Sequence, residues 1–179
     1  MQKLYTHKNL SCGFVILCAD HNIKLAHITI KSIKAKYWGL PYICVLDDSA
    51  NDQDMREISN ICQAYRGKGT YSSLINLGMQ YAPADWNFLI MAGTSLRSKL
   101  DQKFSYFIDN DKDILFPIVD RKYNFVEGTL NGLFINKKTY QEIGNMADNN
   151  PLEICKLMWA LDALDKGCRF KAIANSKLC

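Results

Sequence analysis

The sequence lacks the features that mark secreted, membrane-spanning and zinc-binding proteins. No 18-residue apolar run occurs in the 179 residues, and the opening stretch MQKLYTHKNLSCG is broken by polar side chains, so neither a membrane span nor a secretory signal is predicted. No CxxC pair is present, and His7, His21 and His27 stand at spacings that do not suit zinc ligands. The seven cysteines are odd in number and several lie in apolar runs, which indicates buried thiols in a reducing compartment and predicts a cytoplasmic location.

An excess of charge of one sign is also missing. The net charge is only +4, from 22 Lys and Arg against 18 Asp and Glu, and the basic residues are scattered along the chain. This distribution argues against a nucleic-acid duplex as the partner. With 48% hydrophobic residues and four prolines, the composition is that of an ordinary globular protein, and the length suits one domain over residues 1–179.

Apolar runs and helical patterns alternate along the chain. GFVILCA (13–19), YICVL (42–46) and WNFLIM (86–91) are short apolar runs typical of strands buried on both faces. The other expected elements are a helix from Asn22 to about Trp38, one from Asn51 or Asp52 through Tyr65, one between Gly69 and Pro83, one over 101–109, strands over 114–120 and 132–136, a helix over 137–144, one from Pro151 to about Lys166, and a strand over 168–174. This order predicts an α/β fold with a mainly parallel central sheet flanked by helices.

Three of the expected helices carry apolar stripes at the helical period. The stripes are Met55, Ile58, Ile61, Cys62 and Tyr65 in the second helix, Leu74, Leu77, Gly78 and Tyr81 in the third, and Ile154, Leu157, Met158, Leu161 and Leu164 in the last.

Polar loops follow the three clearest strands. ADHN, DDSAND and MAGTS should converge, because ligands of such sheets bind outside the carboxyl ends of the strands. Asp47 and Asp48 can be explained as a turn and helix cap. One acid would satisfy a cap, however, and Asn51, Asp52 and Asp54 add further capping groups, so we favour a ligand-binding role for Asp48.

Three other stretches imitate functional motifs. RGKGTYSS (66–73) fails the P-loop pattern, because its glycines are two apart and no strand is expected before it; it can still receive an anion or be a solvated basic loop. DNDKD (109–113) resembles a calcium loop, but Ile114 stands where glycine is required. Glu153 follows Asn150 by three residues, which also suits helix capping.

The order of these motifs resembles the family 2 type of GT-A glycosyltransferases, which transfer a sugar from a nucleotide-sugar donor. The matching stretches, over most of the chain, are VILCADHN with TIKSI, VLDDSAND for V-D-D-x-S-x-D with the serine displaced by one residue, SSLINLGMQYAPADWNFLIM for an a-x-N-x-g helix and strand, GLFINKKTYQEIG, and LDKGCRFKAI. The resemblance implies a single-domain, Rossmann-like GT-A fold.

The resemblance also implies a pocket for a UDP-type nucleotide at the ends of the first two strands. By position, Ala19 and His21 approach the base, and Asp48 accepts a hydrogen bond from a uracil-type imide. A carboxylate suits this role because it only accepts hydrogen bonds. Thr70 falls where relatives place a nucleotide contact.

This sequence departs from the family at the end of the third of these strands. There the family's Asp-x-Asp motif holds the Mn or Mg ion that bridges the donor's phosphates. The matching residues are Ala92, Gly93 and Thr94, which offer no carboxylate. We therefore expect a degenerate motif without the usual metal ligands, with Gly93 and Thr94 beside the donor and Lys68 or Arg66 offsetting the phosphate charge.

The family's general base is an acid near the start of the last helix. Its usual position falls near Cys155 and Lys156, and neither is acidic. Glu153 is the nearest substitute, with Asp120 and Glu127 as further candidates.

Two functional interpretations remain open. One is a transferase that passes the donor's sugar to a glycan, lipid or protein acceptor, either without a metal or with Mn or Mg held by Asp48, Asp52 or a later acid in place of the usual ligands. The other is a catalytically inactive domain that binds a nucleotide or glycan, or that serves as an interaction module. A phospho-acceptor receiver is excluded, because it needs acids after the first and third strands, where this chain has ADH and MAGT.

Overall fold

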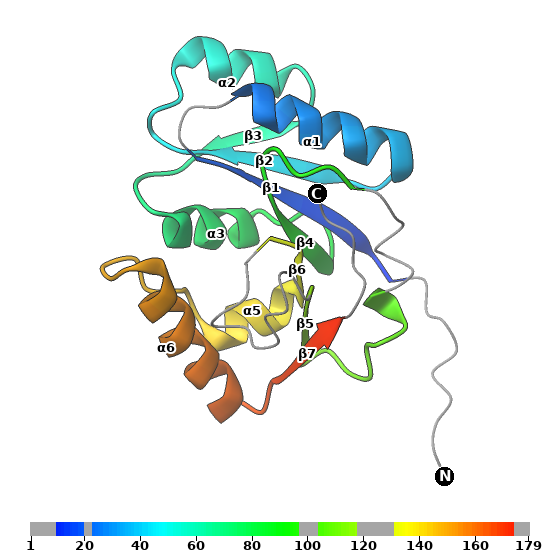
Figure 1. Cartoon of the computed structure of the whole chain (residues 1–179), viewed down its shortest axis with the longest axis vertical. Coiled ribbons are helices and arrows are strands. Elements are labelled where there is room, and N and C mark those ends of the chain that lie inside the picture. The colour runs from blue at the N-terminus through cyan, green and yellow to red at the C-terminus, as the bar shows by residue number, and fades with distance from the viewer. Residues whose placement is uncertain (1–9, 20–22, 97–103, 118–130, 174–179) are drawn as a thin grey trace.

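Seven strands form one mainly parallel sheet in the computed structural model of the chain, which describes residues 10–19, 23–96, 104–117 and 131–173 (Figure 1). In sheet order the strands are β3 (Gln63–Arg66), β2 (Tyr42–Leu46), β1 (Cys12–Cys18), β4 (Trp86–Met91), β6 (Leu133–Asn136), β5 (Asp113–Pro117) and β7 (Arg169–Ile173). β6 runs antiparallel to β4 and β5, and the other pairs are parallel. The predicted α/β architecture is confirmed.

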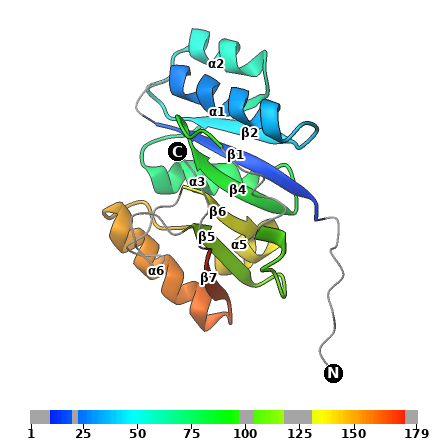
Figure 2. The same cartoon turned by 45° about the vertical axis from the view of Figure 1, so that its right-hand side comes forward.

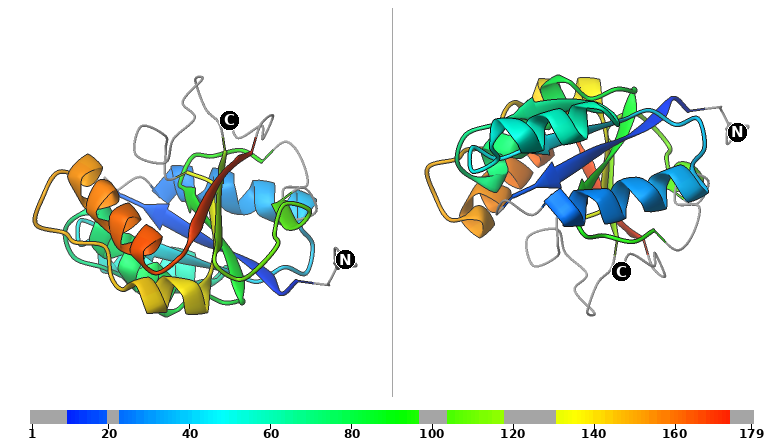
Figure 3. Two further views of the ribbon diagram at one scale, coloured as in Figure 1. Left: turned by 90° about the horizontal axis from the view of Figure 1, so that it is seen from below. Right: turned by 90° about the horizontal axis from the view of Figure 1, so that it is seen from above.

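Helices cover both faces of the sheet. α1 (Ile23–Lys36) and α2 (Asp52–Ser59) lie on one face. α3 (Tyr71–Gln80), α5 (Lys137–Ile143) and α6 (Leu152–Asp165) lie on the other, as the two end views show (Figure 3). The sheet is therefore the middle of three layers.

β1 joins the two halves of the core. All seven of its residues are buried, as its continuous apolar run predicts. Phe14 and Ile16 pack in the cluster beneath α1, while Val15 and Leu17 pack in the cluster beneath α3. This alternation follows from the two-residue period of a strand.

The second helix is shorter than predicted. α2 ends at Ser59, where the following amides of Ile61 and Cys62 bond back to the Ile58 carbonyl. The chain then enters the edge strand β3, which contains Tyr65. A four-residue strand is too short to show its own period, so Tyr65 matched the helical stripe by coincidence. The expectation that no strand precedes the RGKG loop is therefore wrong.

α6 has the predicted extent, but its predicted apolar stripe faces outward. The residues of this α6 stripe are each 45–53% exposed and are Ile154, Leu157, Met158, Leu161 and Leu164. The inner face instead carries Cys155, Lys156, Trp159, Ala160 and Ala163. Trp159 fixes this orientation, because its indole N–H donates to the Gly144 carbonyl at 2.9 Å and its ring packs against Tyr140.

Most of the remaining described elements agree with the sequence. α3, α5 and β7 form at the expected places, and five of the cysteines are buried. The helix expected over 101–109 is shorter than predicted in its described part, since residues 104 and 105 are helical and 106 and 107 form a turn, while 101–103 lie outside the described residues. Residues 118–120, the end of the strand expected over 114–120, also lie outside the described residues. Within the described ranges, no helix is long and apolar enough to cross a membrane.

Gly78 allows α3 to lie directly on β1. A Cβ atom at this position would clash with Cγ1 of Val15 and would lie 3.4 Å from Cγ2 of Val45. Both valines are buried and β-branched, so they cannot easily turn away.

We predict that Gly78→Ala lowers the free energy of unfolding by about 1–2 kcal/mol, because overpacking outweighs the gain of about 1 kcal/mol in helix propensity. Urea denaturation measures the change. In the Val15→Ala background the same substitution should cost less, since the clashing methyl group is gone. Equal costs in the two backgrounds would contradict this account of the α3–β1 contact.

Candidate functional site

The carboxyl ends of β1, β2, β3 and β4 lie side by side at one edge of the sheet. Three backbone hydrogen bonds join the loops that follow them: Asp47 N–H to the Cys18 carbonyl at 3.1 Å, Gly67 N–H to the Leu46 carbonyl at 2.8 Å, and Ala92 N–H to the Leu17 carbonyl at 2.8 Å. We call this region the carboxyl edge. It contains the loops after β2, β3 and β4, together with Ala19 at the end of β1.

The two adjacent aspartates after β2 differ in their surroundings. Asp47 is only 8% exposed, accepts a hydrogen bond from the Ser49 hydroxyl at 2.5 Å, and closes a turn through its carbonyl to the Ala50 amide. Asp48 is exposed, and within the described residues it has no hydrogen bond or ion pair. Asp47 therefore shapes the loop, and Asp48 is available to a ligand.

Neither aspartate caps the helix that follows. The N-cap of α2 is Asn51, whose side chain accepts from the Asp54 amide at 2.9 Å. The Asp54 carboxylate in turn accepts from the Asn51 amide, also at 2.9 Å, which completes a capping box. The alternative explanation of Asp47 and Asp48 as helix caps is wrong.

The basic loop, residues 66–69 from the last residue of β3 onward, contains one paired and one unengaged cation. Arg66 donates to Asp52 at 2.8 Å, and its hydrogen bond and positive charge hold the pKa of Asp52 below its ordinary value. Lys68 is exposed and has no hydrogen bond or ion pair among the described residues. Thr70 is the N-cap of α3, where its hydroxyl accepts from the Ser73 amide at 3.4 Å.

The segment after β4 is held against α1. Gly93 has φ +95° and donates its amide to the Leu25 carbonyl at 2.9 Å. Thr94 is only 5% exposed; its carbonyl accepts from the Thr29 hydroxyl at 3.0 Å and its own hydroxyl accepts from the Asn131 side-chain amide at 2.8 Å. The Thr94 side chain is therefore a fixed part of the turn.

The residues at the end of β4 do not fit a divalent metal site. Mn and Mg prefer carboxylate oxygens, and Ala92, Gly93 and Thr94 supply none. Across the described ranges, no three His, Cys, Asp or Glu side chains are grouped so that they could hold a metal ion. We derive no catalytic step through a metal.

A pocket of about 520 Å³ opens beside the carboxyl edge, on the α3 side of the sheet. The residues that line it are Arg66, Gly67, Lys68, Ser73, Asn76, Leu77, Met79, Gln80, Tyr140, Gln141 and Asn145. Lys68 lines the pocket and Asp48 does not. The basic loop is therefore the part of the carboxyl edge that the pocket shares with the region around Asp48.

Glu153 lies exposed in the first turn of α6. The N-cap of this helix is Pro151, which has no side chain able to cap it, and the Asn150 side chain donates to Asn149 instead. The predicted capping by Asn150 and Glu153 is therefore wrong. No described residue hydrogen-bonds to Glu153, and the first turn of a helix favours a negative charge.

The loop before α6 is tied to α3. Ser73 donates to the Asp148 carboxylate at 2.9 Å, and the Asn76 side chain bonds both the carbonyl and the amide of Met146 at 2.8 Å. Since α3 begins at the carboxyl edge, these bonds bring the start of α6 to the α3 side of that edge (Figure 1).

Two asparagines that we did not single out from the sequence hold this region together. Asn131 fixes Thr94 and also accepts from the Met91 amide at 3.0 Å. Asn76 binds the loop before α6 and accepts from the Tyr140 hydroxyl. Asn76 is the asparagine of the a-x-N-x-g pattern, so the sequence did contain a signal for it. Asn131 is an isolated asparagine in a loop, and no sequence pattern marks it.

Three of the candidate residues, His21, Asp120 and Glu127, lie outside the described residues. The structure therefore places Ala19, Asp48, Lys68, Thr70, Gly93 and Thr94 along the carboxyl edge, with Glu153 on its α3 side.

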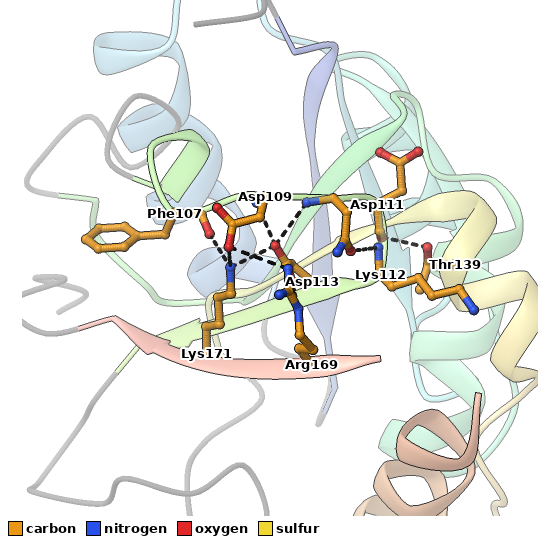
Figure 4. Close-up of polar contacts among 9 residues, drawn as sticks. Phe107, Asp109, Asp111, Lys112, Asp113, Thr139, Arg169 and Lys171 are labelled. Carbon is orange, nitrogen blue, oxygen red and sulfur yellow. Dashed lines mark hydrogen bonds and ion pairs between the residues drawn. The ribbon is translucent and has the colours of Figure 1, made fainter. Parts of the chain in front are cut away.

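A second charged cluster lies at the opposite edge of the sheet, where β5 and β7 begin (Figure 4). The Asp113 carboxylate is fully buried and accepts from Lys171 at 2.8 Å and from Arg169 at 2.7 and 2.8 Å. The amides of Asp109 and Asn110 also donate to it. Both oxygens of this carboxylate have hydrogen-bond partners within the chain, so Asp113 stabilises the sheet and is not a calcium ligand.

Burial alone would raise the pKa of the Asp113 carboxyl. The hydrogen bonds from Lys171, from the amides of Asp109 and Asn110, and from Arg169 outweigh burial and hold this pKa below its ordinary value.

Comparisons with known proteins identify the fold. The sequence matches no protein-family model and no curated protein. Among solved structures, S. aureus TarS 1-349 in complex with UDP-GlcNAc has a TM-score of 0.65 at 10% identity, over 93% of this chain and 57% of that chain. The mannosyltransferase PcManGT from Pyrobaculum calidifontis, in complex with GDP-Man and Mn²⁺, has a TM-score of 0.69 at 9% identity, over 92% and 55%.

These similarities show that the chain has a GT-A-like glycosyltransferase fold. The chain spans little more than half the length of these two solved chains. At such low identity the comparison concerns the fold alone.

We predict that Asp113→Asn lowers the free energy of unfolding by about 2–4 kcal/mol at pH 7, because it removes the buried carboxylate and leaves Lys171 and Arg169 only the exposed Asp109 as an anionic partner. Since the folded-state pKa is depressed, the charge stabilises the fold above the unfolded-state pKa of about 4, and this contribution is lost as pH falls through the folded value. Urea denaturation at pH 7 and at pH 3 should show that the free energy of unfolding falls less with pH in the variant than in the wild type. The exposed neighbour Asp111, changed to Asn, is the control; an equal effect there would contradict the assignment.

Proposed function

We propose that the protein binds a UDP-type nucleotide-sugar at the carboxyl edge and transfers the sugar to an acceptor hydroxyl group. The observation that carries this proposal is Asp48, an exposed carboxylate at the end of a buried strand that serves no capping role. The GT-A-like fold supports it, and solved structures of similar fold hold UDP-GlcNAc and GDP-Man.

In this proposal Asp48 accepts a hydrogen bond from the imide N–H of the base. Ala19, after β1, would approach the base, where its small side chain leaves room for a ring, and His21 is assigned to the same contact by its position in the sequence. Thr70 contacts the nucleotide at the start of α3, where the helix N-terminus favours an anion such as a phosphate. These roles follow from position along the edge and from hydrogen-bonding chemistry.

The phosphates require positive charge that the chain itself supplies. Lys68 is the better of the two basic candidates, because Arg66 is already paired with Asp52. At the end of β4, Gly93 has no side chain, so a phosphate can come close to its backbone. The hydrogen bond between Thr94 and Asn131 fixes the shape of that turn.

Glu153 is the proposed general base. As the acceptor oxygen attacks the anomeric carbon of the donor, Glu153 would take its proton, and the bond from that carbon to the nucleoside diphosphate would break. Its exposure and its lack of a capping role suit this step. Asp120 is the second candidate for the same role. The acceptor, whether glycan, lipid or protein, is not specified by these residues.

The second candidate function is a catalytically inactive domain that binds a nucleotide or glycan. The observation that favours it is the turn after β4, which lacks carboxylates and whose Thr94 hydroxyl is already bonded to Asn131. Nucleotide binding without sugar transfer or donor hydrolysis would distinguish this function from a transferase.

We predict that UDP at about one hundred times its dissociation constant stabilises the protein by about 2.7 kcal/mol and raises Tm by about 5–10 °C. Asp48→Ala should abolish this shift, measured by differential scanning fluorimetry with and without Mn. The control is Asp85→Ala, which removes an exposed aspartate at the opposite edge of the sheet. If no nucleotide or nucleotide-sugar stabilises the wild type, the transferase and the nucleotide-binding form of the inactive domain are both wrong.

We predict that Glu153→Gln lowers the rate of sugar transfer or donor hydrolysis by about 10²–10⁴-fold, because a general base is removed, while the UDP-induced shift in Tm is kept. Glu142→Gln is the control, since it removes only an exposed contact of 3.9 Å with Lys138. Turnover that survives Glu153→Gln would exclude Glu153 from the base role. The measurement is donor consumption followed by chromatography.

A further inference from the structure

The α6 stripe is an apolar surface that the described part of the chain leaves uncovered. In Figure 2, α6 lies at the periphery of the layer formed with α3 and α5. Its inner face is apolar as well, apart from Lys156. A helix that is apolar on both faces is typical of one buried between two layers, so a second layer is expected over its outer face.

The spacing of the stripe suits a second helix. Ile154, Leu157, Leu161 and Leu164 are separated by three, four and three residues, which is the a and d spacing of a coiled-coil seam. This order is the same when read backwards. An antiparallel copy of α6 would therefore place Ile154 against Leu164 of the second copy and Leu157 against Leu161, with Met158 near the two-fold axis.

The charges of α6 are compatible with this pairing. Glu153 and Asp165 lie on opposite flanks of the seam, so the acids of two antiparallel copies do not face each other. Antiparallel helix dipoles also attract. A lipid surface fits less well, because interfacial helices carry Lys and Arg beside their apolar face, whereas the exposed charges of α6 are Glu153, Asp162 and Asp165.

The exposed area suits a weak interface. The stripe exposes on the order of 450 Å² per copy, so two stripes would bury about 900 Å² before flanking side chains are counted, which approaches the lower limit of about 1,200 Å² for specific interfaces.

We propose that α6 packs antiparallel against α6 of a second copy of the chain and forms a symmetric dimer. The proposal rests on the exposed α6 stripe, its palindromic spacing and the placement of its acids. It is independent of donor binding, and it would hold equally for a transferase or an inactive domain.

Sedimentation equilibrium of the full chain in reducing buffer tests the proposal. The wild type should shift from monomer to dimer with rising concentration, and Leu161→Glu should raise the dimer dissociation constant at least tenfold. The matched control is Ile28→Glu, because Ile28 is an equally exposed apolar residue on α1. A wild type that stays monomeric to about 1 mM, or a Leu161→Glu variant that dimerises like the wild type, would overturn the proposal and leave the stripe to another occupant.

Cysteine cross-linking tests the orientation. Chains carrying Leu157→Cys and Leu161→Cys, distinguished by a tag, are mixed and oxidised, with the unsubstituted chain as the background. An antiparallel pair should give mainly the mixed disulfide, because residue 157 then faces residue 161. Mainly homodisulfides would show a parallel pair and contradict the proposed geometry.

Discussion

The parallel pairing of β1 with β2 and β4 is the constraint on which the rest of the structure depends. β1 is buried on both faces and pairs with β4 from Cys12 to Leu17 and with β2 from Phe14 to Cys18. Because neighbouring parallel strands end at the same edge, the chain crosses back over the sheet after β1, β2 and β3, and the loops that follow β1 to β4 return to one place. This geometry brings Asp48, Lys68 and Gly93 together from three distant parts of the sequence.

The polar groups of the fold divide into those already satisfied within the chain and those exposed to a ligand. Asp47, Asp54 and Asp113 have partners that close a turn, cap a helix and join two strands. Asp48 and Glu153 are exposed and make no such bond within the described residues. A carboxylate that stabilises nothing locally is available for recognition or proton transfer, and both of these lie near the carboxyl edge. The turn after β4 is the opposite case, because its Thr94 hydroxyl is already committed to Asn131.

The strands β1, β2 and β4 and their alternation with helices could be predicted, because continuous apolar runs depend on local sequence alone. The orientation of α6 could not, since both of its faces are apolar and the choice was made by the contacts of Trp159 with Gly144 and Tyr140. β3 was missed because a short edge strand has no distinctive period. At the site, Asp48 was predicted from its place after a buried strand. Asn131 was not, because its partners after β4 become neighbours only in the folded sheet.

The central claim is that the carboxyl edge binds a nucleotide. Amide chemical shifts measured by NMR during a titration with UDP test it most directly, since they locate the ligand without assuming catalysis. The account predicts saturable changes at Ala19, Asp48, Lys68 and Gly93, with little change at Trp38 at the far edge of the sheet. Saturable changes centred on that far edge, or no saturable changes at all, would contradict it.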